Sequence, residues 1–467
     1  MKKLHFFKPV YDNVGIDNLI PEMWAQESLV ILEENMVIAN RVYRDFSNEI
    51  ANYGDTVNAH RPAILTAKRK DVNDDVTIQN ATVDNVPVVL NQHLHVSILL
   101  RDAEMSKSFK DLIQLFLRPA MIGIASGVDK VLLGYVPQFL PNYAGGLDSL
   151  AAGNALSYVL GARKIMNDHK APMAGRDLLI TSATETTLLG IEQFISAEKV
   201  GDVGTALREA SLGRKLGFNI FMGQNTPYVL TGAADVLATV GEINNGAGYP
   251  AGTATITVDG YTGDVVPVGS FITIEGSMYP YKVTARTAAP NTTSLTVTPT
   301  LRVAVLNDAN ITVFLPCVVD LPASSYAAGY VKVIHVDGYT VVPQVGQLIQ
   351  DASQNVYTVM EVSGNTGTEC DLLLNRPLVA TIADGAILGV GPGGAYNFGF
   401  VRDALALVNR PLALPQAPAK AAVASYNNLS MRAVITYDGR AQGHLVTLDM
   451  LCGAAVLNPA LGVVLLG

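Results

Sequence analysis

The sequence has little of what disulfide frameworks, zinc sites and membrane spans require. Its 467 residues include only three cysteines, which lie far apart and form no Cys-x-x-Cys pair, so neither a disulfide framework nor a structural zinc site is expected. No uninterrupted apolar run reaches the ~18–20 residues of a transmembrane helix, and the basic start lacks the apolar stretch of a signal peptide. These absences predict a soluble protein made in a reducing cytoplasm.

Motifs for catalysis or cofactor binding are also scarce. The seven histidines are scattered, and there is no His-Glu-x-x-His, no phosphate loop with Gly-Lys-Ser/Thr and no Gly-x-Ser-x-Gly elbow. His93 and His95 share one strand face, but no nearby cysteine or carboxylate pattern completes a metal site, so we predict a structural or surface role for them. Residues 389–394 fit Gly-x-Gly-x-x-Gly, yet they include Pro392 and lead into an extended segment rather than a helix. We interpret them as a hinge, and predict no enzyme activity, cofactor or metal.

The composition supports folded cores but not tight nucleic-acid binding. Hydrophobic residues make up 49% of the chain and charged residues 16%, which predicts two or three packed domains rather than disorder. The 41 glycines and 23 prolines indicate many turns and favour a β-rich content. The formal net charge is −9, so any DNA contacts are expected to be weak and non-specific.

Residues 55–104 are predicted to form two long strands with a charged tip between them. From Val88 to Leu100 the residues follow mostly period two, the pattern of a half-buried strand. The tip places basic residues directly before acidic ones: Lys68, Arg69, Lys70, Asp71, Asp74 and Asp75. Such a tip is either a solvated turn or a contact for complementary charges on another chain. Because a lone two-stranded hairpin is marginal in water, we favour the contact.

Residues 106–135 have the strongest helical pattern. Apolar residues fall at three- and four-residue steps: Phe109, Leu112, Phe116, Ala120, Ile124, Val128 and Val131. At ~1.5 Å per residue this helix would span roughly 40–45 Å, which suits a beam in a flat, extended subunit. Pro119 lies inside the pattern and is predicted to kink the helix, because proline lacks an N–H and crowds the preceding turn.

Residues 151–224 alternate helix and strand, which predicts a mixed α/β domain. Helices are expected over Asn154–Asp168 and Thr184–Ser196, and strands over Arg176–Ser182 and Gly217–Met222. The apolar side of the first helix is expected to include Leu156, Val159, Leu160 and Met166.

The two ends of the chain are less regular. Residues 1–50 are interpreted mostly as an arm with one short helix over Glu27–Ala39. Near the other end, Phe400–Asn409 is predicted to be a short helix that stops before Pro411. The expected strands of this part are Leu429–Tyr437, His444–Leu448, Ala454–Leu457 and Val463–Leu466, with a turn at Asp438-Gly439 between the first two.

Residues 230–395 contain an internal duplication. Val258-Asp259-Gly260-Tyr261-Thr262 recurs as Val336-Asp337-Gly338-Tyr339-Thr340, an offset of 78 (336 − 258). Further landmarks recur in the same order: Val266-Pro267 with Val342-Pro343, Tyr281 with Tyr357, Leu301 with Leu378, and Val313 with Val390. Helical periodicity is absent, so we predict two tandem antiparallel β modules at about 248–314 and 328–391. They would interrupt a body whose parts, 100–224 and 396–467, must combine to complete a core.

The order of these parts resembles the tailed-bacteriophage major capsid proteins of the Hong Kong 97 fold, most of all the short-tailed phage coat proteins with an inserted β domain. One stretch that carries the resemblance is Val88–Leu133, with Val96-Ser97-Ile98, Arg118-Pro119-Ala120 and Val128-Asp129-Lys130. The other is Phe400–Gly467, with Phe400-Val401-Arg402-Asp403-Ala404, Tyr437-Asp438, Leu451-Cys452-Gly453 and Asn458-Pro459. The chain departs from the family in carrying two inserted modules rather than one.

The resemblance implies an α+β fold with a defined division of the chain. In order, the parts would be an N-terminal arm (1–54), an extended loop over a neighbour (55–104), the spine helix and peripheral domain (105–149), the first part of the axial domain (150–229), the inserted β domain (230–395), the second part of the axial domain (396–440) and the C-terminal strands of the peripheral domain (441–467).

The resemblance also implies a function. The chain would assemble as hexamers and pentamers into an icosahedral shell around double-stranded DNA, in the virion, after assembly in the host cytoplasm. A scaffold protein, a portal and a cement protein would be its partners, with no cofactor and no membrane. One alternative is a phage tail or surface adhesion protein whose tandem β modules bind a ligand. Another is a hydrolase with an unrecognised site.

Overall fold

The structure is a computed structural model that describes most of the chain. Asp71 and Asp74 lie outside the described residues, and so do residues 102–115, which include the first part of the long helix expected over 106–135. The described ranges are 16–46, 52–61, 65, 67–70, 75–76, 78, 84–101, 116–147, 149–196, 209–229, 235–261, 266–287, 292–320, 325–329, 332–415, 420–440 and 443–467.

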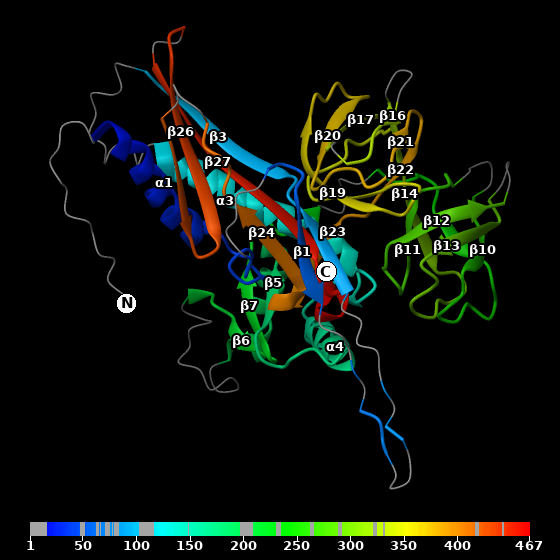
Figure 1. Cartoon of the computed structure of the whole chain (residues 1–467). Coiled ribbons are helices and arrows are strands. Elements are labelled where there is room, and N and C mark those ends of the chain that lie inside the picture. Colours follow the sequence, from blue (N-terminus) through cyan, green and yellow to red (C-terminus); the bar gives the residue numbers. More distant parts are fainter. Residues whose placement is uncertain are drawn as a thin grey trace.

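One sheet of the body combines a strand from the first hundred residues with strands from the C-terminal part. Its order is β24 (Leu405–Arg410), β27 (Gly443–Val456), β26 (Leu429–Asp438) and β25 (Lys420–Tyr426), and β3 (Gln92–Arg101) also pairs with β27. Helices α1 (Ile16–Asn35) and α3 (Arg118–Leu133) lie side by side along this sheet (Figure 1). Their buried apolar residues belong to one core with those of the strands.

The second sheet joins the segments on either side of the insertion. Its order is β4 (Tyr143–Gly145), β28 (Gly462–Leu466), β23 (Gly394–Val401), β5 (Arg176–Ile180), β7 (Phe218–Met222) and β6 (Gly213–Lys215), with β8 (Tyr228–Val229) beside β23. The helices of this part are α4 (Ala155–Asp168), α5 (Ser182–Leu189) and α6 (Glu192–Ile195). The pairing of β23 with β5 and of β28 with β4 confirms that the interrupted body closes on itself.

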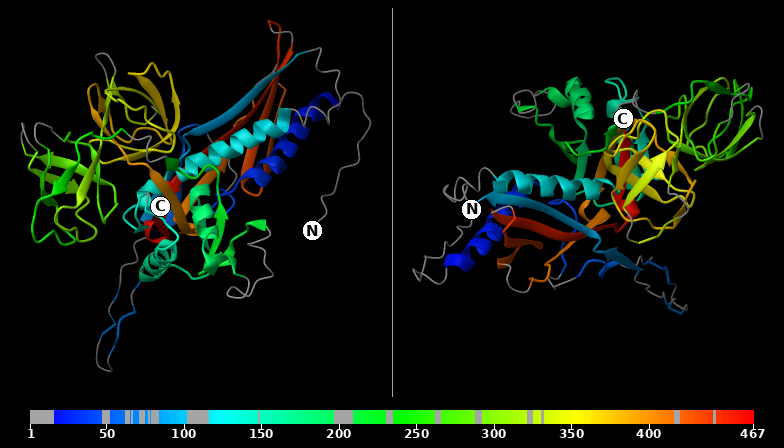
Figure 2. Two further views of the ribbon diagram at one scale, coloured as in Figure 1. Left: turned by 180° about the vertical axis from the view of Figure 1, so that it is seen from behind. Right: turned by 90° about the horizontal axis from the view of Figure 1, so that it is seen from above.

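The insertion forms two closed six-stranded barrels beside the body (Figures 1 and 2). Barrel 1 consists of β9 (Gly241–Ile243), β10 (Thr255–Asp259), β11 (Phe271–Ile274), β12 (Tyr281–Arg286), β13 (Ser294–Thr298) and β14 (Asn310–Phe314). Barrel 2 consists of β15 (Cys317–Val319), β17 (Val333–Asp337), β18 (Leu348–Gln350), β19 (Val356–Ser363), β20 (Cys370–Leu374) and β22 (Ile387–Val390), with the ribbon β16 (Ser325–Tyr326) and β21 (Ile382–Ala383).

The two barrels match each other in the order in which the sequence repeats. Both barrels close with the same strand order, and both carry a bulge at the matching place, between Val283 and Ala285 and between Val359 and Glu361. The modules begin earlier than expected, at Gly241 and Cys317, because each opens with a strand of only three residues. So short a strand carries too few side chains for a period to be recognised.

Several expected elements were wrong in kind or extent. The helix expected over Phe400–Asn409 is the end of β23, a 3-10 turn at Arg402–Ala404, and β24. Both strands are buried at every position, so they show no alternation, and a short apolar run of this kind does not distinguish strand from helix. The segment Ala454–Leu457 is not a separate strand, because β27 continues through Val456.

The α/β segment follows the expectation more closely. Helix α4 and strands β5 and β7 lie where they were predicted, although Leu160 is exposed rather than on the buried side of α4. The helix expected over Thr184–Ser196 is two helices, since α5 ends at Leu189 and α6 begins at Glu192.

The N-terminal segment is more ordered than an arm with one short helix. Helix α1 has 20 residues, and Trp24, Leu29 and Leu32 are buried among α3, β25 and β26. The prediction missed the first half of this helix.

Pro119 lies in the first turn of α3. Phe116 and Leu117, directly before α3, are in π-helical conformation, so the helical path changes its winding next to this proline. The predicted kink concerns the junction with residues 102–115, outside the described part, and stays a prediction. The stretch Arg118–Phe139 is apolar and long enough to span a membrane by length and composition, but 67% of that window is buried inside the protein. This burial is typical of a core helix.

Candidate assembly surfaces

In the sequence, a hairpin lies between helix α1 and strand β3. Strands β1 (Thr56–Arg61) and β2 (Asp84–Val89) pair in antiparallel register, from Thr56 opposite Val89 to Arg61 opposite Asp84. The single strand expected over Val88–Leu100 is therefore two strands with different partners. The chain leaves β2 at Leu90 and enters β3 at Gln92, where it joins β27.

The base of the hairpin is anchored to the body. Ala59, Val88 and Leu90 form a buried cluster with three residues of β24 and β27: Ala406, Val408 and Leu451. The Arg61 guanidinium donates two hydrogen bonds to the Leu457 carbonyl, at 3.0 Å from Nε and 2.7 Å from Nη2. The direction in which the hairpin leaves the body is thereby set by packed side chains.

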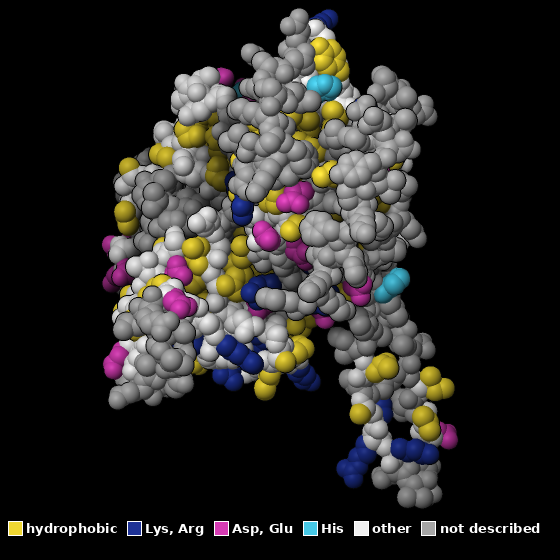
Figure 3. Space-filling view, turned by 90° about the vertical axis from the view of Figure 1, so that its left-hand side faces the viewer, with side chains coloured by type: hydrophobic (Ala, Val, Ile, Leu, Met, Phe, Trp, Pro, Cys, Tyr) yellow, Lys and Arg dark blue, Asp and Glu magenta, His cyan; other side chains and the backbone are white. Residues whose placement is uncertain are grey.

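Beyond this base, the described segments between β1 and β2 project away from the body (Figure 1). Leu65, Val76 and Ile78 are 61%, 72% and 87% exposed. The predicted contact residues Lys68, Arg69, Lys70 and Asp75 are exposed as well. Hydrophobic and Lys or Arg side chains occur together on this projection (Figure 3). Burying one large apolar side chain contributes about 1.5–3 kcal/mol, so the projection has the composition of a surface that a partner would cover.

A buried carboxylate connects the N-terminal segment to α3. Asp129 accepts hydrogen bonds from the backbone N–H groups of Val37, at 2.9 Å, and Ala39, at 3.3 Å. Burial raises the pKa of Asp129 to about 6, although its backbone hydrogen bonds oppose that rise. This contact fixes the end of the α1 segment on the helix that runs through the body.

A second buried carboxylate ties three strands together. Asp449 of β27 accepts from Nε of Arg432, on β26, at 2.9 Å and from Nη2 of the same guanidinium; it also lies 3.0 Å from Nε2 of His93, on β3. Burial acts to raise the pKa of Asp449, but the hydrogen bonds from His93 and Arg432 outweigh it and lower that pKa. His93 thus has the structural role expected of it.

Polar contacts fix barrel 2 to the body. Gln92 Nε2 donates to the Asn375 carbonyl at 2.8 Å, and Thr358 Oγ1 donates to the Gly134 carbonyl at 3.0 Å. Gly134 has no room for a side chain, because a Cβ there would lie 2.4 Å from Cβ of Asn375.

Barrel 1 is fixed to barrel 2 in a similar way. Lys282 of barrel 1 is buried and donates to the Asp351 carbonyl of barrel 2 at 2.6 Å. Asp235, just before barrel 1, accepts from the Thr340 N–H of barrel 2 at 2.7 Å. The two barrels and the body therefore form a continuous packed unit.

Within the described ranges, no group of three His, Cys, Asp or Glu side chains could hold a metal ion. Cys317, Cys370 and Cys452 are free and buried. Residues 389–394 connect β22 to β23, so the glycine pattern is followed by a strand and is not a dinucleotide-binding turn.

Sequence reasoning located the hairpin tip but missed two features of these surfaces. The exposed apolar residues Leu65, Val76 and Ile78 are visible in the sequence, yet only the projection of the hairpin shows that no part of the same copy covers them. The contact of Asp129 with Val37 joins residues 92 positions apart, and no local pattern signals it.

No protein-family model matches the sequence, and no curated protein matches it. Among solved structures, the chain is similar to one described as Mycobacterium phage Che8, at 12% identity and a TM-score of 0.41, over 92% of this chain and 90% of that one. It is also similar to the capsid structure of the Cyanophage P-SCSP1u, at 10% identity and a TM-score of 0.41, over 92% and 91% of the two chains. The bacteriophage PhiM1 mature capsid follows at 8% identity and a TM-score of 0.39, over 100% and 92%. At these identities and TM-scores, neither family nor function follows from likeness alone.

Proposed function

We propose that this chain is the major capsid protein of a tailed double-stranded DNA phage, with a Hong Kong 97-like fold, and that it assembles into an icosahedral shell. The observation that carries the proposal is the projecting hairpin. Its base is anchored by buried side chains, whereas its distal part exposes three large apolar residues beside three cations. A second copy of the chain is the occupant that would cover this surface in a shell.

The energetics of a shell agree with such a subunit. Specific interfaces bury about 800 Å² per partner, and a projecting hairpin adds contact area without enlarging the core. Each subunit in a shell has several neighbours, so modest interfaces suffice. The rigid attachment of the hairpin base lowers the entropy that is lost on docking.

The sheets suggest an amended division of the chain for this proposal. The peripheral part would contain α1, α3, β3 and β24–β27, and the axial part would contain β4–β8, α4–α6, β23 and β28. Residues 405–438 thus move to the peripheral part and residues 462–466 to the axial part, because strands that share a ladder belong to one unit. The arm, the extended loop and the insertion keep their places.

Partners and location are part of the proposal. The shell would consist of hexamers and pentamers in the virion, formed in the host cytoplasm with a scaffold protein, a portal and a cement protein. Packaged DNA would be contacted weakly, which agrees with the net charge of −9.

The test is a charge reversal at the hairpin tip. We expect K68E/R69E/K70E to fold, because all three side chains are exposed in the single copy. We expect it to assemble poorly, because the proposed contact with another copy loses its three cations. A matched control, K164E/K170E/R214E, reverses three exposed cations elsewhere on the body. Electron microscopy and sedimentation would measure particles, and circular dichroism would measure folding. Normal particles from the tip variant would refute the contact role of the tip.

A phage tail or surface adhesion protein remains the second candidate, because tandem β barrels are suited to ligand binding. The same micrographs separate the two functions. Closed shells, or rings of five or six subunits, support the capsid proposal, whereas fibres or trimers support the adhesion protein.

A further inference from the structure

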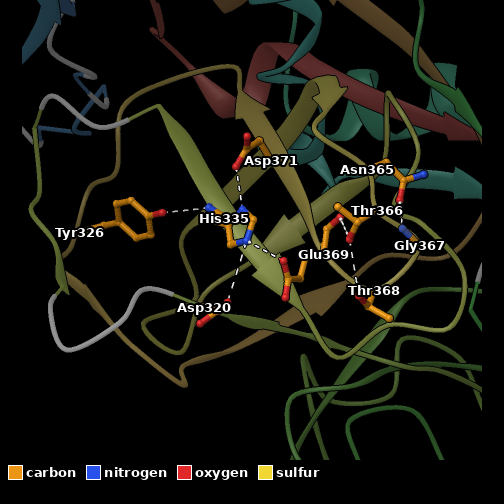
Figure 4. Close-up of polar contacts among 9 residues, drawn as sticks. All are labelled: Asp320, Tyr326, His335, Asn365, Thr366, Gly367, Thr368, Glu369 and Asp371. Carbon is orange, nitrogen blue, oxygen red and sulfur yellow. Dashed lines mark hydrogen bonds and ion pairs between the residues drawn. The ribbon is translucent and has the colours of Figure 1, made fainter.

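Barrel 2 carries one histidine among three carboxylates on its outer face. His335 lies on β17, and its Nδ1 is 2.8 Å from Asp371 Oδ1. Its Nε2 is 3.7 Å from Glu369 Oε2 and 3.9 Å from Asp320 Oδ2 (Figure 4). The side chain of His335 is partly exposed, so it exchanges protons with solvent. We call these four residues the His335 cluster.

Barrel 1 contains the same framework without the charges. In barrel 2, His335 stands directly opposite Asp371, and its carbonyl accepts from the Asp320 N–H. In barrel 1, Thr257 stands opposite Ser294, and the Thr257 carbonyl accepts from the Asn244 N–H. Thr257, Ser294 and Asn244 thus match His335, Asp371 and Asp320, and all three are uncharged.

The backbone support of the position is shared too. The Tyr326 hydroxyl accepts from the His335 N–H at 2.9 Å, and the Tyr249 hydroxyl accepts from the Thr257 N–H at 2.9 Å. The fold of the module therefore does not require the His335 cluster, and the cluster distinguishes one barrel from the other.

The three carboxylates around His335 favour a proton on each of its ring nitrogens. A neutral imidazole has one donor and one acceptor. If its donor faces Asp371, its lone pair faces Glu369 and Asp320, and both contacts become repulsive. A protonated ring donates a hydrogen bond from Nδ1 to Asp371, and its positive charge offsets charge on all three carboxylates.

The other described groups near His335 do not supply positive charge that could replace its proton. Asp337 lies two residues further on the same outer face of β17 and adds negative charge, and Tyr326 contributes its neutral hydroxyl. Every ion pair found for His335 among the described residues is with a carboxylate.

We propose that the His335 cluster is a pH-dependent clasp, which holds the Asn365–Glu369 turn and Asp320 against β17 while His335 is protonated, and loosens them when it is not. The hydrogen bond that His335 donates to Asp371 raises the pKa of His335 against the opposing effect of burial, so the clasp stays closed to a higher pH than an unperturbed histidine would allow. Sign and direction follow from the raised pKa: the contribution is present at low pH and is lost as the pH rises through the pKa of the folded state.

Hydrogen exchange of the full chain from about pH 5 to about pH 9, corrected for the intrinsic effect of pH, tests the clasp. We expect protection of residues 332–337 and 365–373 to fall severalfold across the titration of His335. The matching segments of barrel 1, 254–259 and 292–296, are an internal control and should show no such step. H335T, which installs the side chain of Thr257, should remove the step, and D371S should shift it to lower pH.

A flat profile in barrel 2, or an equal step in barrel 1, would overturn the clasp. If H335T does not fold, the comparison of the two barrels within the wild-type chain still shows whether the pH step belongs to the His335 cluster. The result is independent of shell formation, because the measurement needs only the folded subunit.

Discussion

At the scale of single residues, two buried carboxylates in the body behave in opposite ways. Asp129 accepts hydrogen bonds only from backbone N–H groups, so burial dominates and raises its pKa. Asp449 faces the Arg432 guanidinium and His93, whose hydrogen bonds lower its pKa despite burial. The residue type is the same, and the surroundings decide the sign.

Asp129 predicts a component of stability that weakens as pH rises. Its pKa is about 6 in the folded protein against an ordinary value of 3.8, so its contribution is complete below about pH 4 and is lost as the pH rises through 6. Relative to D129N, which does not titrate, the free energy of unfolding of the wild type should fall by about 2–3 kcal/mol between about pH 4 and about pH 7. Urea unfolding across this range measures it. Parallel profiles for the two proteins would contradict the assignment.

Arg432 predicts a large loss on truncation. R432M removes the guanidinium that pairs with the buried Asp449 carboxylate, and breaking a buried pair typically costs about 3–5 kcal/mol. R432M/D449N removes the uncompensated charge and should recover part of that stability. Chemical denaturation of both variants checks this, and a double variant less stable than R432M would rule out the explanation.

At the scale of elements, regular periodicity could be predicted and tertiary burial could not. Helix α4 and strand β26 have one polar side and follow their sequence patterns. Strand β24 is buried on both faces, so its apolar run gave no period and was predicted as a helix. The predicted range of helix α1 was too short, because the elements that α1 packs against, α3 and β25, are remote in sequence. The hairpin tip was found because its charges are consecutive.

The duplicated barrels predict matched effects of matched mutations. The Tyr281 hydroxyl accepts from the Arg302 N–H, and the Tyr357 hydroxyl accepts from the Val379 N–H, both at 3.0 Å. Y281F and Y357F should each destabilise the protein by about 1–2 kcal/mol, because each leaves a backbone donor without its acceptor. Thermal unfolding of the two variants measures the effect. A loss in one barrel and none in the other would show that the two hydroxyls are not equivalent.

At the scale of the whole molecule, the described part of the chain combines packed cores with a projecting hairpin. Body and barrels are joined by buried contacts such as Lys282 with Asp351 and Gln92 with Asn375. Beyond Arg61 the hairpin projects from the body, and its residues Leu65, Val76 and Ile78 are exposed in a single copy. The sequence predicted that a partner would be needed here, but the receiving surface depends on contacts between copies and has no signature in one chain.

The most direct test of the central claim is thiol labelling of I78C in purified particles and in dissociated subunits. Ile78 is 87% exposed in the single copy, so I78C should react rapidly in subunits and be protected in particles. The native cysteines supply the background control: all three are buried, and burial raises the pKa of the Cys317 and Cys452 thiols to about 12. Protection in particles alone is the predicted result. Equal labelling in both states, or a wild-type protein that stays a monomer, would contradict the account.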